Sequence, residues 1–148
     1  MPLLGGKMFK LKSEIQFDMA HYLSGYNGKC ANIHGHRYRL IATLKVDELK
    51  QDKQTRGMVE DFGEFKKGLK VISDMFDHKL IMEDNEEGRE IYSKLKEVSD
   101  FEIVLLPFRT TAEEMSRYIY RKLKEMNFPI YEVELFETPT NSIIYSEE

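Results

Sequence analysis

Cysteine and tryptophan are almost missing from this chain, whose 148 residues include one cysteine and no tryptophan. A single cysteine cannot form an intramolecular disulfide, so a disulfide-stabilised extracellular fold is not indicated. The sequence also lacks a signal-peptide-like apolar run at its start and any apolar stretch of membrane-spanning length. We therefore expect a cytoplasmic protein without a membrane partner, and a chain of this length can bury a sufficient core.

The chain also lacks an excess of basic residues. The chain has 22 Lys and Arg against 26 Asp and Glu, which gives a net charge of −4 at pH 7. A general nucleic-acid binder needs a basic surface, so we expect no nucleic-acid partner. A small anionic ligand is compatible with this balance, because a few local cations suffice to bind it. No repeat or linker is visible, which predicts one domain over residues 1–148, with Met1 to about Lys7 flexible.

Alternating apolar residues predict two strands in the first third of the chain. From Phe9 to His21 the odd positions are mainly apolar and the even positions polar, so His21 is in phase with the apolar face. The next strand begins near Ile33, and His34 and His36 share its apolar face because side chains two residues apart point the same way. If the two strands pair as an antiparallel hairpin, the three histidines converge.

Two amphipathic helices are predicted further along the chain. Apolar side chains recur at steps of three and four from Phe62 to Phe76, after Asp61 as a suitable N-cap. Thr111 and Glu114 have the spacing of a capping box, and an apolar stripe as far as Met126 follows them.

The remaining segments predict the rest of a sheet. Alternation from Tyr131 to Glu137 indicates a third strand, and Ser142 to Tyr145 forms a short last one. We interpret the acidic stretch Glu83 to Glu90 as a loop, residues 91–98 as one or two helical turns, and Phe101 to Leu106 as a buried strand or a connector. The order ββ, α, α, ββ predicts an α+β domain with a largely antiparallel sheet.

The histidines of the predicted hairpin, His21, His34 and His36, are candidate metal ligands. Imidazole is a preferred ligand of zinc, and three protein ligands with one open position describe a catalytic zinc site. Two alternatives remain. Cys30 is a candidate fourth ligand of a closed site, or the His-Gly-His run marks only a turn and His21 a polar strand end.

Further residues are candidates for proton transfer and substrate binding. Cys30 lies in a polar loop four residues before His34, where a nearby cation would favour a reactive thiolate. Asp77 and His78 follow the first predicted helix directly, although helix ends often carry such residues for structural reasons alone. Glu137 is in phase with an apolar strand face, which is costly unless the carboxylate is paired or binds a ligand with adjacent N–H donors. The alternative is that Glu137 turns outward to water.

Together these residues form a recognisable order of short motifs. The motifs are Phe17-Asp18-Met19-Ala20-His21, Cys30-x-x-x-His34-Gly35-His36, Met58-Val59-Glu60-Asp61-Phe62, Asp77-His78, Thr111-Ala112-Glu113 and Glu137-Thr138. The order resembles the 6-pyruvoyltetrahydropterin synthase / 6-carboxytetrahydropterin synthase family from about Phe9 to Tyr145. The three-residue gap between Cys30 and His34 is similar to the bacterial-type 6-carboxytetrahydropterin synthase of the queuosine pathway, because the 6-pyruvoyl branch typically has a longer gap.

The resemblance implies a tunnelling fold (T-fold), in which ββααββ subunits with two helices on one face join their sheets into a barrel, as trimers that stack into hexamers. It implies Zn²⁺ on His21, His34 and His36, with active sites at subunit interfaces. It also implies Cys30 as general base, a relay through Asp77 and His78, and Glu137 as the anchor of the pterin ring. The implied reaction converts 7,8-dihydroneopterin triphosphate to 6-carboxy-5,6,7,8-tetrahydropterin, with loss of acetaldehyde and triphosphate.

Some features depart from the family pattern or leave alternatives open. Thr110 stands where a proline often precedes the Thr-x-Glu motif, and the segment from Glu83 to Asp100 is longer than in compact relatives. Arg37 and Arg39 lie on the strand face opposite the histidines, which counts against a role in triphosphate binding. A 6-pyruvoyl-forming or other side-chain-cleaving activity is the near alternative. A zinc-stabilised pterin-binding protein without catalysis is the alternative from another class.

Overall fold

The computed structural model describes residues 6–148, which contain ten secondary-structure elements. In chain order they are β1 (Phe9–His21), the 3₁₀ turn η1 (Lys29–Ala31), β2 (His34–Val46), α1 (Phe62–Phe76), β3 (Lys79–Glu83), α2 (Glu86–Val98), β4 (Ile103–Leu106), α3 (Ala112–Glu125), β5 (Ile130–Thr138) and β6 (Asn141–Tyr145). The predicted flexibility of Met1 to about Lys7 falls largely on residues 1–5, which lie outside the described residues.

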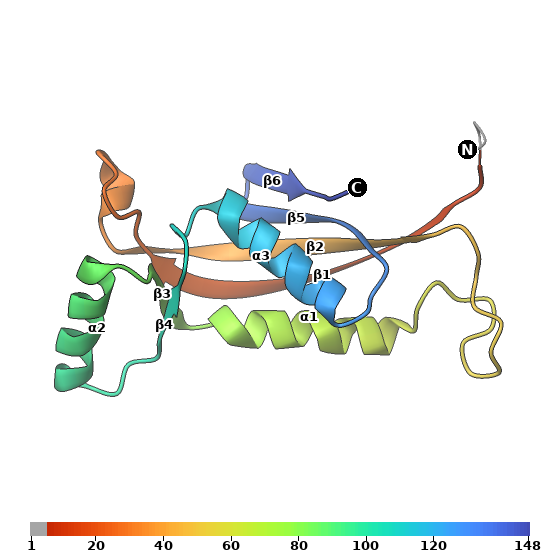
Figure 1. The fold of residues 1–148 in the computed structure, drawn as a ribbon, viewed down its shortest axis with the longest axis horizontal. Coiled ribbons are helices and arrows are strands. Elements are labelled where there is room, and N and C mark those ends of the chain that lie inside the picture. Colours follow the sequence, from red (N-terminus) through yellow and green to blue (C-terminus); the bar gives the residue numbers. More distant parts are fainter. Residues whose placement is uncertain (1–5) are drawn as a thin grey trace.

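The strands form one six-stranded sheet in the order β4-β3-β1-β2-β5-β6. The β1–β2 hairpin is antiparallel and in register from Phe9 opposite Val46 to His21 opposite His34, so the predicted pairing is confirmed (Figure 1). β5 and β6 continue the antiparallel pattern. On the other side of β1, however, β3 and β4 pair in parallel, so the sheet is mixed.

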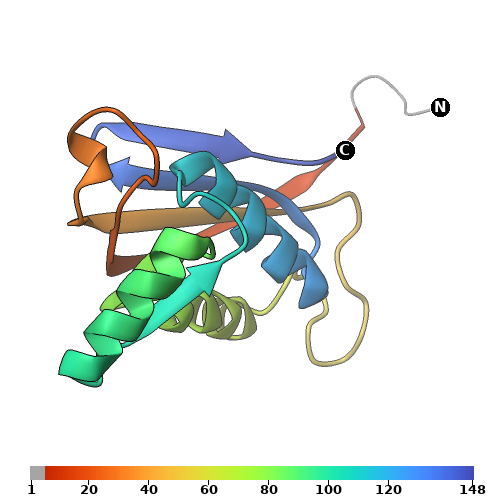
Figure 2. The same ribbon diagram turned by 60° about the vertical axis from the view of Figure 1, so that its left-hand side comes forward.

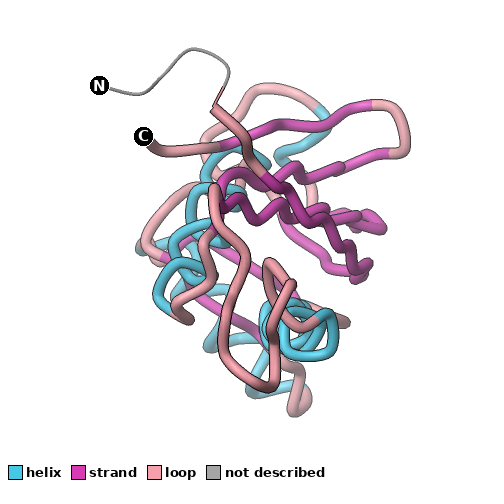
Figure 3. The backbone as a smooth tube through the Cα atoms, turned by 90° about the vertical axis from the view of Figure 1, so that its right-hand side faces the viewer, coloured by secondary structure: helices cyan, strands magenta, loops and turns pink. Residues whose placement is uncertain are grey.

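Helices α1 and α3 cover one face of this sheet (Figure 3). The apolar positions that share the odd phase of β1 and the even phase of β2 point towards these helices, and they are the buried ones. Both helices begin at the predicted N-caps, because the side chain of Asp61 accepts from the Glu64 amide and that of Thr111 from the Glu114 amide. The domain is α+β, as the sequence predicted. The core between the sheet and the two helices contains Phe17, Tyr38, Leu40, Phe65, Leu69, Ile72, Phe76, Met115, Ile119, Val133 and Leu135.

A third helix corrects the interpretation of the acidic stretch from Glu83 to Glu90 as a loop. Helix α2 begins at Glu86, after an N-cap in which the side chain of Asn85 accepts from the Gly88 amide at 2.7 Å. Acidic residues in a first helical turn are stabilised by the unpaired N–H groups and the helix dipole, so Glu86 and Glu87 favour a helix start. Figure 2 shows α2 and β4 at the side of the molecule remote from the carboxyl terminus. No helix in residues 6–148 has the length and hydropathy needed to cross a membrane.

Candidate active site

Three histidines meet at the end of the β1–β2 hairpin. His21 is the last residue of β1 and lies opposite His34, the first residue of β2, while His36 follows on the same strand face. The ring centroids lie 4.7 Å apart for His21 and His34, 4.8 Å for His34 and His36, and 5.5 Å for His21 and His36. One ring nitrogen of each lies within 4.8 Å of the other two, so the predicted convergence is confirmed.

Backbone carbonyls fix the orientation of two of these rings. The Nδ1–H of His21 donates to the carbonyl oxygen of Thr110 at 2.9 Å, and the Nδ1–H of His34 donates to the carbonyl oxygen of Asn32 at 2.6 Å. A carbonyl can only accept, so each Nδ1 carries the proton and each Nε2 carries the lone pair. Metal-bound histidines usually have this second hydrogen bond, which holds the ring and sets its tautomer.

Burial disfavours the charged form of two of these rings, His21 and His36. Burial lowers the pKa of His21 to about 4, and the side chain is only 1% exposed. Burial also lowers the pKa of His36, and the nearby carboxylate of Glu137 opposes this effect in part. Neutral imidazole is the form that binds a metal ion, so the lowered pKa values of His21 and His36 favour metal binding.

Tyr38 closes the inner wall of the histidine group. Its hydroxyl lies 3.3 Å from His21 Nε2, and its side chain is fully buried. Burial, reinforced by the carboxylate of Glu137, raises the pKa of Tyr38, so the phenol stays protonated across the physiological range. It therefore offers a neutral hydroxyl rather than a phenolate to the centre.

Glu137 reaches the histidine group from β5. A register irregularity between Phe136 and Thr138 marks a β-bulge at this residue. Bulges redirect a side chain out of the regular strand alternation and are frequent next to active sites. The Oε1 atom of Glu137 lies 3.5 Å from His36 Nε2, and the side chain is 28% exposed. Its carboxylate is therefore available at the edge of the site.

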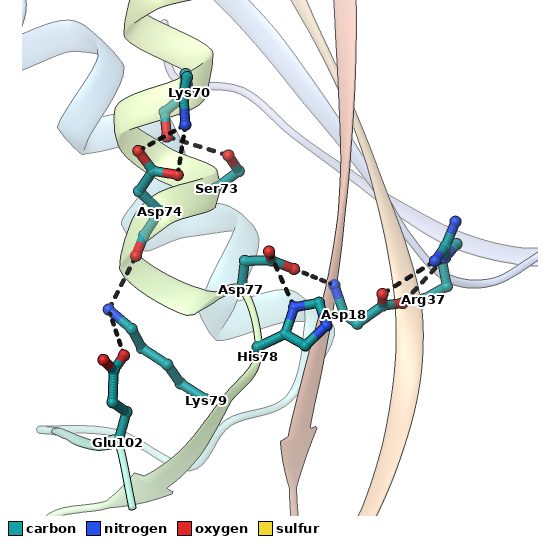
Figure 4. Close-up of polar contacts among 9 residues, drawn as sticks. All are labelled: Asp18, Arg37, Lys70, Ser73, Asp74, Asp77, His78, Lys79 and Glu102. Carbon is teal, nitrogen blue, oxygen red and sulfur yellow. Dashed lines mark hydrogen bonds and ion pairs between the residues drawn. The ribbon is translucent and has the colours of Figure 1, made fainter.

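Asp77 and His78 form a second polar group, tied to β1 from the end of α1 (Figure 4). The Oδ1 atom of Asp77 accepts from the Asp18 amide at 2.9 Å, and its Oδ2 lies 3.0 Å from His78 Nδ1. The Asp18 amide, followed by His78, lowers the pKa of Asp77 and keeps it ionised. His78 donates its own amide to the Asp18 carbonyl at 2.6 Å, with a left-handed φ of 60°. The imidazole is thus held by a carboxylate while it remains 78% exposed.

Cys30 lies in the η1 turn that leads into β2 and is partly buried. Its carbonyl oxygen accepts from the Leu23 amide at 2.7 Å, which closes the loop between the two strands. Within the described part of the chain, its sulfur does not join the group of mutually close metal-ligand atoms that contains the three histidines. This arrangement disfavours the alternative in which Cys30 completes a closed four-ligand site.

Two grooves meet at His36. An open groove of about 700 Å³ extends from His36 to His78, and its apolar lining includes Ile33, Leu80, Leu95 and Phe101. A smaller groove of about 320 Å³ lies between His36 and Glu137. Together they provide room for a small molecule that extends from Glu137 past His36 to His78.

Comparison with known proteins agrees with the motifs and the geometry. The model of the family described as 6-pyruvoyl tetrahydropterin synthase matches residues 10–148. The chain belongs to this family. It is 39% identical over 142 residues to a protein of Haemophilus influenzae named 6-carboxy-5,6,7,8-tetrahydropterin synthase, a match that covers 95% of this chain and 100% of that protein. It is 32% identical to a protein of Dictyostelium discoideum named 6-pyruvoyl tetrahydrobiopterin synthase, over 82% of this chain and 76% of that one.

Solved structures show the same fold. An uncharacterized protein of Wolinella succinogenes superposes with a TM-score of 0.75 at 20% identity, over 96% of this chain and 99% of that one. The 6-pyruvoyl tetrahydropterin synthase of Caenorhabditis elegans superposes with a TM-score of 0.68 at 25% identity, over 96% and 97% of the two chains. The T-fold subunit predicted from the motifs is therefore confirmed, and family membership makes the chain an enzyme of the tetrahydropterin synthase type.

The donor set fits the metal that the family implies. The Nε2 atoms of His34 and His36 are buried and have no hydrogen-bond partner among residues 6–148. Buried polar atoms without partners are costly, and a metal ion at the centre of the three rings would satisfy both of them. Three nitrogen donors suit zinc among the common divalent ions.

Thr110 and Asn32 are the residues that sequence reasoning missed. Both act through a backbone carbonyl, which every residue has, so no side-chain motif marks them. The only signal at Thr110 was that it replaces the usual proline. That signal is weak, because proline and threonine both supply a backbone carbonyl oxygen. Asp18 lay within a quoted motif, but its backbone contacts to the Asp77–His78 pair depend on the fold.

Proposed function

We propose that the chain is a zinc-dependent 6-carboxy-5,6,7,8-tetrahydropterin synthase of queuosine biosynthesis. Its substrate is 7,8-dihydroneopterin triphosphate, and its products are the carboxylated tetrahydropterin, acetaldehyde and triphosphate. The observation that carries this proposal is the histidine group with two unpaired Nε2 atoms, in a chain 39% identical to a protein of that name. We further propose that the enzyme is cytoplasmic and works as a homo-oligomer, a trimer or a hexamer.

The reaction balances without a redox cofactor. Loss of triphosphate and hydrogen shifts within the substrate reduce the ring to the tetrahydro level and oxidise the side chain to a diketone, which is the 6-pyruvoyl compound. Addition of one water then cleaves the bond between the two carbonyl carbons, which yields the carboxylate and acetaldehyde. The two candidate activities therefore differ by one water and one carbon–carbon cleavage. The gap of three residues between Cys30 and His34 supports the reaction that includes this cleavage and forms the 6-carboxy product.

His21, His34 and His36 would hold the zinc ion, which would supply a Lewis acid for a side-chain oxygen of the substrate. The chain's own residues then have three tasks: they bind the ring, they move protons and they exclude competing orientations. Thr110 and Asn32 keep His21 and His34 in the ligand tautomer throughout.

Cys30 and His78 are assigned the proton transfers. Cys30 takes a proton from a carbon of the substrate side chain. His78 returns a proton, because Asp77 holds its Nδ1 and the residue lines the groove that also contains His36. Cys30, before β2, and His78, after α1, come from different elements, so separate groups are available for the two proton transfers.

Glu137 is assigned the recognition of the pterin ring. Its carboxylate offers two acceptors to the 2-amino group and the neighbouring ring N–H, an arrangement that gives paired charge-assisted hydrogen bonds. The bulge and the small groove beside His36 support this assignment, because they leave the carboxylate accessible next to the histidines.

Product analysis tests the proposal. The zinc-loaded protein is incubated with 7,8-dihydroneopterin triphosphate, and acetaldehyde, triphosphate and the pterin products are quantified, with Cys30→Ala as the control. Acetaldehyde with 6-carboxytetrahydropterin supports the proposal. Formation of the 6-pyruvoyl compound without acetaldehyde would assign the activity named for the Dictyostelium relative. Full pterin binding without any turnover would favour the non-catalytic alternative.

A further inference from the structure

Arg109 holds the loop that carries Cys30. Its Nη2 and Nε atoms donate to the carbonyl oxygen of Ser24 at 2.7 and 3.1 Å, across 85 residues of sequence. A planar guanidinium that donates twice to one acceptor fixes both position and direction. Leu23, one residue earlier, donates its amide to the Cys30 carbonyl. Arg109 therefore holds the residue next to Leu23, which is itself hydrogen-bonded to the backbone of Cys30.

A second contact leads from Arg109 to the same turn. The guanidinium lies over the ring of Tyr26, with 5.8 Å between Arg109 Cζ and the ring centroid. The same ring lies close to Gly28, where an added Cβ would lie 2.7 Å from a ring carbon. Gly28 is the N-cap of η1, the turn that contains Cys30. Arg109 thus supports Cys30 through a hydrogen bond and through an aromatic ring.

The neighbouring residue links this support to the histidines. Thr110, directly after Arg109, accepts the hydrogen bond of His21. Helix α2 also supports the cysteine loop, because Asn85 at its N-cap donates to the Ser24 hydroxyl at 3.1 Å. Two consecutive residues therefore hold the proposed zinc ligand and the cysteine loop at a fixed separation.

We propose that Arg109 is a positioning residue, which keeps the Cys30 thiol aimed at the substrate and away from the metal ligands. The effect on turnover rests on the proposed role of Cys30, whereas the effect on the loop does not. Small displacements of a reacting group cost up to about 100-fold in rate, so a loosened loop lowers kcat far more than it changes KM.

The test compares the zinc-loaded Arg109→Gln and Tyr26→Ala proteins with wild type and with Arg117→Gln. Arg117 is an exposed arginine of α3 that pairs with Glu114, and its variant is the control for loss of one positive charge. Three properties are measured: metal content, the rate of alkylation by iodoacetamide, and deuterium exchange of the peptide around residues 22–33. Alkylation reports on Cys30 alone because it is the only cysteine. Steady-state kcat and KM are measured in parallel.

We expect Arg109→Gln to keep its zinc, to alkylate and exchange several-fold faster, and to lose at least about tenfold in kcat with little change in KM. Tyr26→Ala, which leaves the charge in place and removes a half-exposed ring, is expected to change in the same direction by less. Arg117→Gln should match wild type.

Unchanged alkylation and exchange in both variants would overturn the proposal, whatever the activity. A rise in KM alone would assign Arg109 to substrate binding instead and would also overturn it. If wild type proves to have a different activity, or none, the alkylation and exchange rates still decide the question. If Arg109→Gln fails to fold, the same comparison is made with Tyr26→Ala.

Discussion

His21 donates its Nδ1–H to the carbonyl oxygen of Thr110 at 2.9 Å, and this contact joins the end of β1 to the segment just before α3. The bond crosses 89 residues of sequence and leaves His21 Nε2 directed at the other two histidines and the Tyr38 hydroxyl. The tautomer of the ring is therefore set by the tertiary fold, before any metal binds.

Removing a histidine ligand should remove the metal. We expect His34→Ala to lose stoichiometric zinc, because two imidazoles retain a divalent ion far less strongly than three. The matched control is His78→Ala, which removes an exposed imidazole outside the histidine group and should keep full zinc. Metal analysis after gel filtration measures both. Equal zinc loss in the two variants would show that the metal site lies elsewhere.

Thr110→Val should bind zinc nearly as well as wild type. The main acceptor for His21 is the Thr110 backbone carbonyl, which valine retains, whereas the side-chain oxygen lies farther away at 3.2 Å. Loss of an outer-shell partner usually costs about 10–100-fold in metal affinity, so a loss below about tenfold is expected here. Competition with a chelator gives the affinity. A larger loss would assign the orienting role to the hydroxyl instead.

The metal-free protein should lose stability as the pH falls from about 6.5 to about 4. Burial lowers the pKa of His21 from 6.5 to about 4, so in this range the unfolded chain binds a proton that the folded chain does not. The free energy of unfolding therefore decreases as the pH falls through this window and levels off below it, by at most about 3 kcal/mol. Urea unfolding of chelator-treated protein measures the slope.

His21→Gln is the control for this slope. It cannot titrate, whereas the carboxylates of the two proteins titrate alike, so the difference between wild type and variant isolates the histidine. Identical slopes in the two proteins would contradict the predicted protonation.

His78→Gly should raise stability while it abolishes turnover. His78 has a left-handed φ of 60°, which costs a residue with a Cβ roughly 1 kcal/mol and costs glycine nothing. Its backbone bond to Asp18 persists in the variant. Asn127 has a φ of 69° at the end of α3, so Asn127→Gly should give a comparable gain with normal activity. Thermal unfolding and product assays measure the two effects. Normal turnover in His78→Gly would remove this residue from the mechanism.

Local patterns predicted the hairpin and the histidine group because both depend on strand phase. A period of two places His21, His34 and His36 on one face, and antiparallel pairing in the observed register then brings them together. The caps at Asp61 and Thr111 are equally local, since each side chain bonds an amide three residues ahead.

Other features depend on contacts that no local pattern contains. The parallel pairing of β3 with β1 and β4 joins segments far apart in the chain, and the support of His21 by Thr110 uses a backbone atom. The start of α2 was misinterpreted because acidic residues are common both in loops and in first helical turns. Glu137 was predicted from simple strand phase, whereas a bulge at that residue sets its direction.

The most direct test of the proposed centre is X-ray absorption spectroscopy of the zinc-loaded, substrate-free protein at the zinc edge. A centre built from His21, His34 and His36, with Cys30 nearby but unbound, predicts three imidazole nitrogens at about 2.0 Å and no sulfur in the coordination shell. Cys30→Ala should give the same spectrum. A zinc–sulfur distance of about 2.3 Å in wild type, absent in Cys30→Ala, would show that Cys30 is a ligand and would contradict its role as the base.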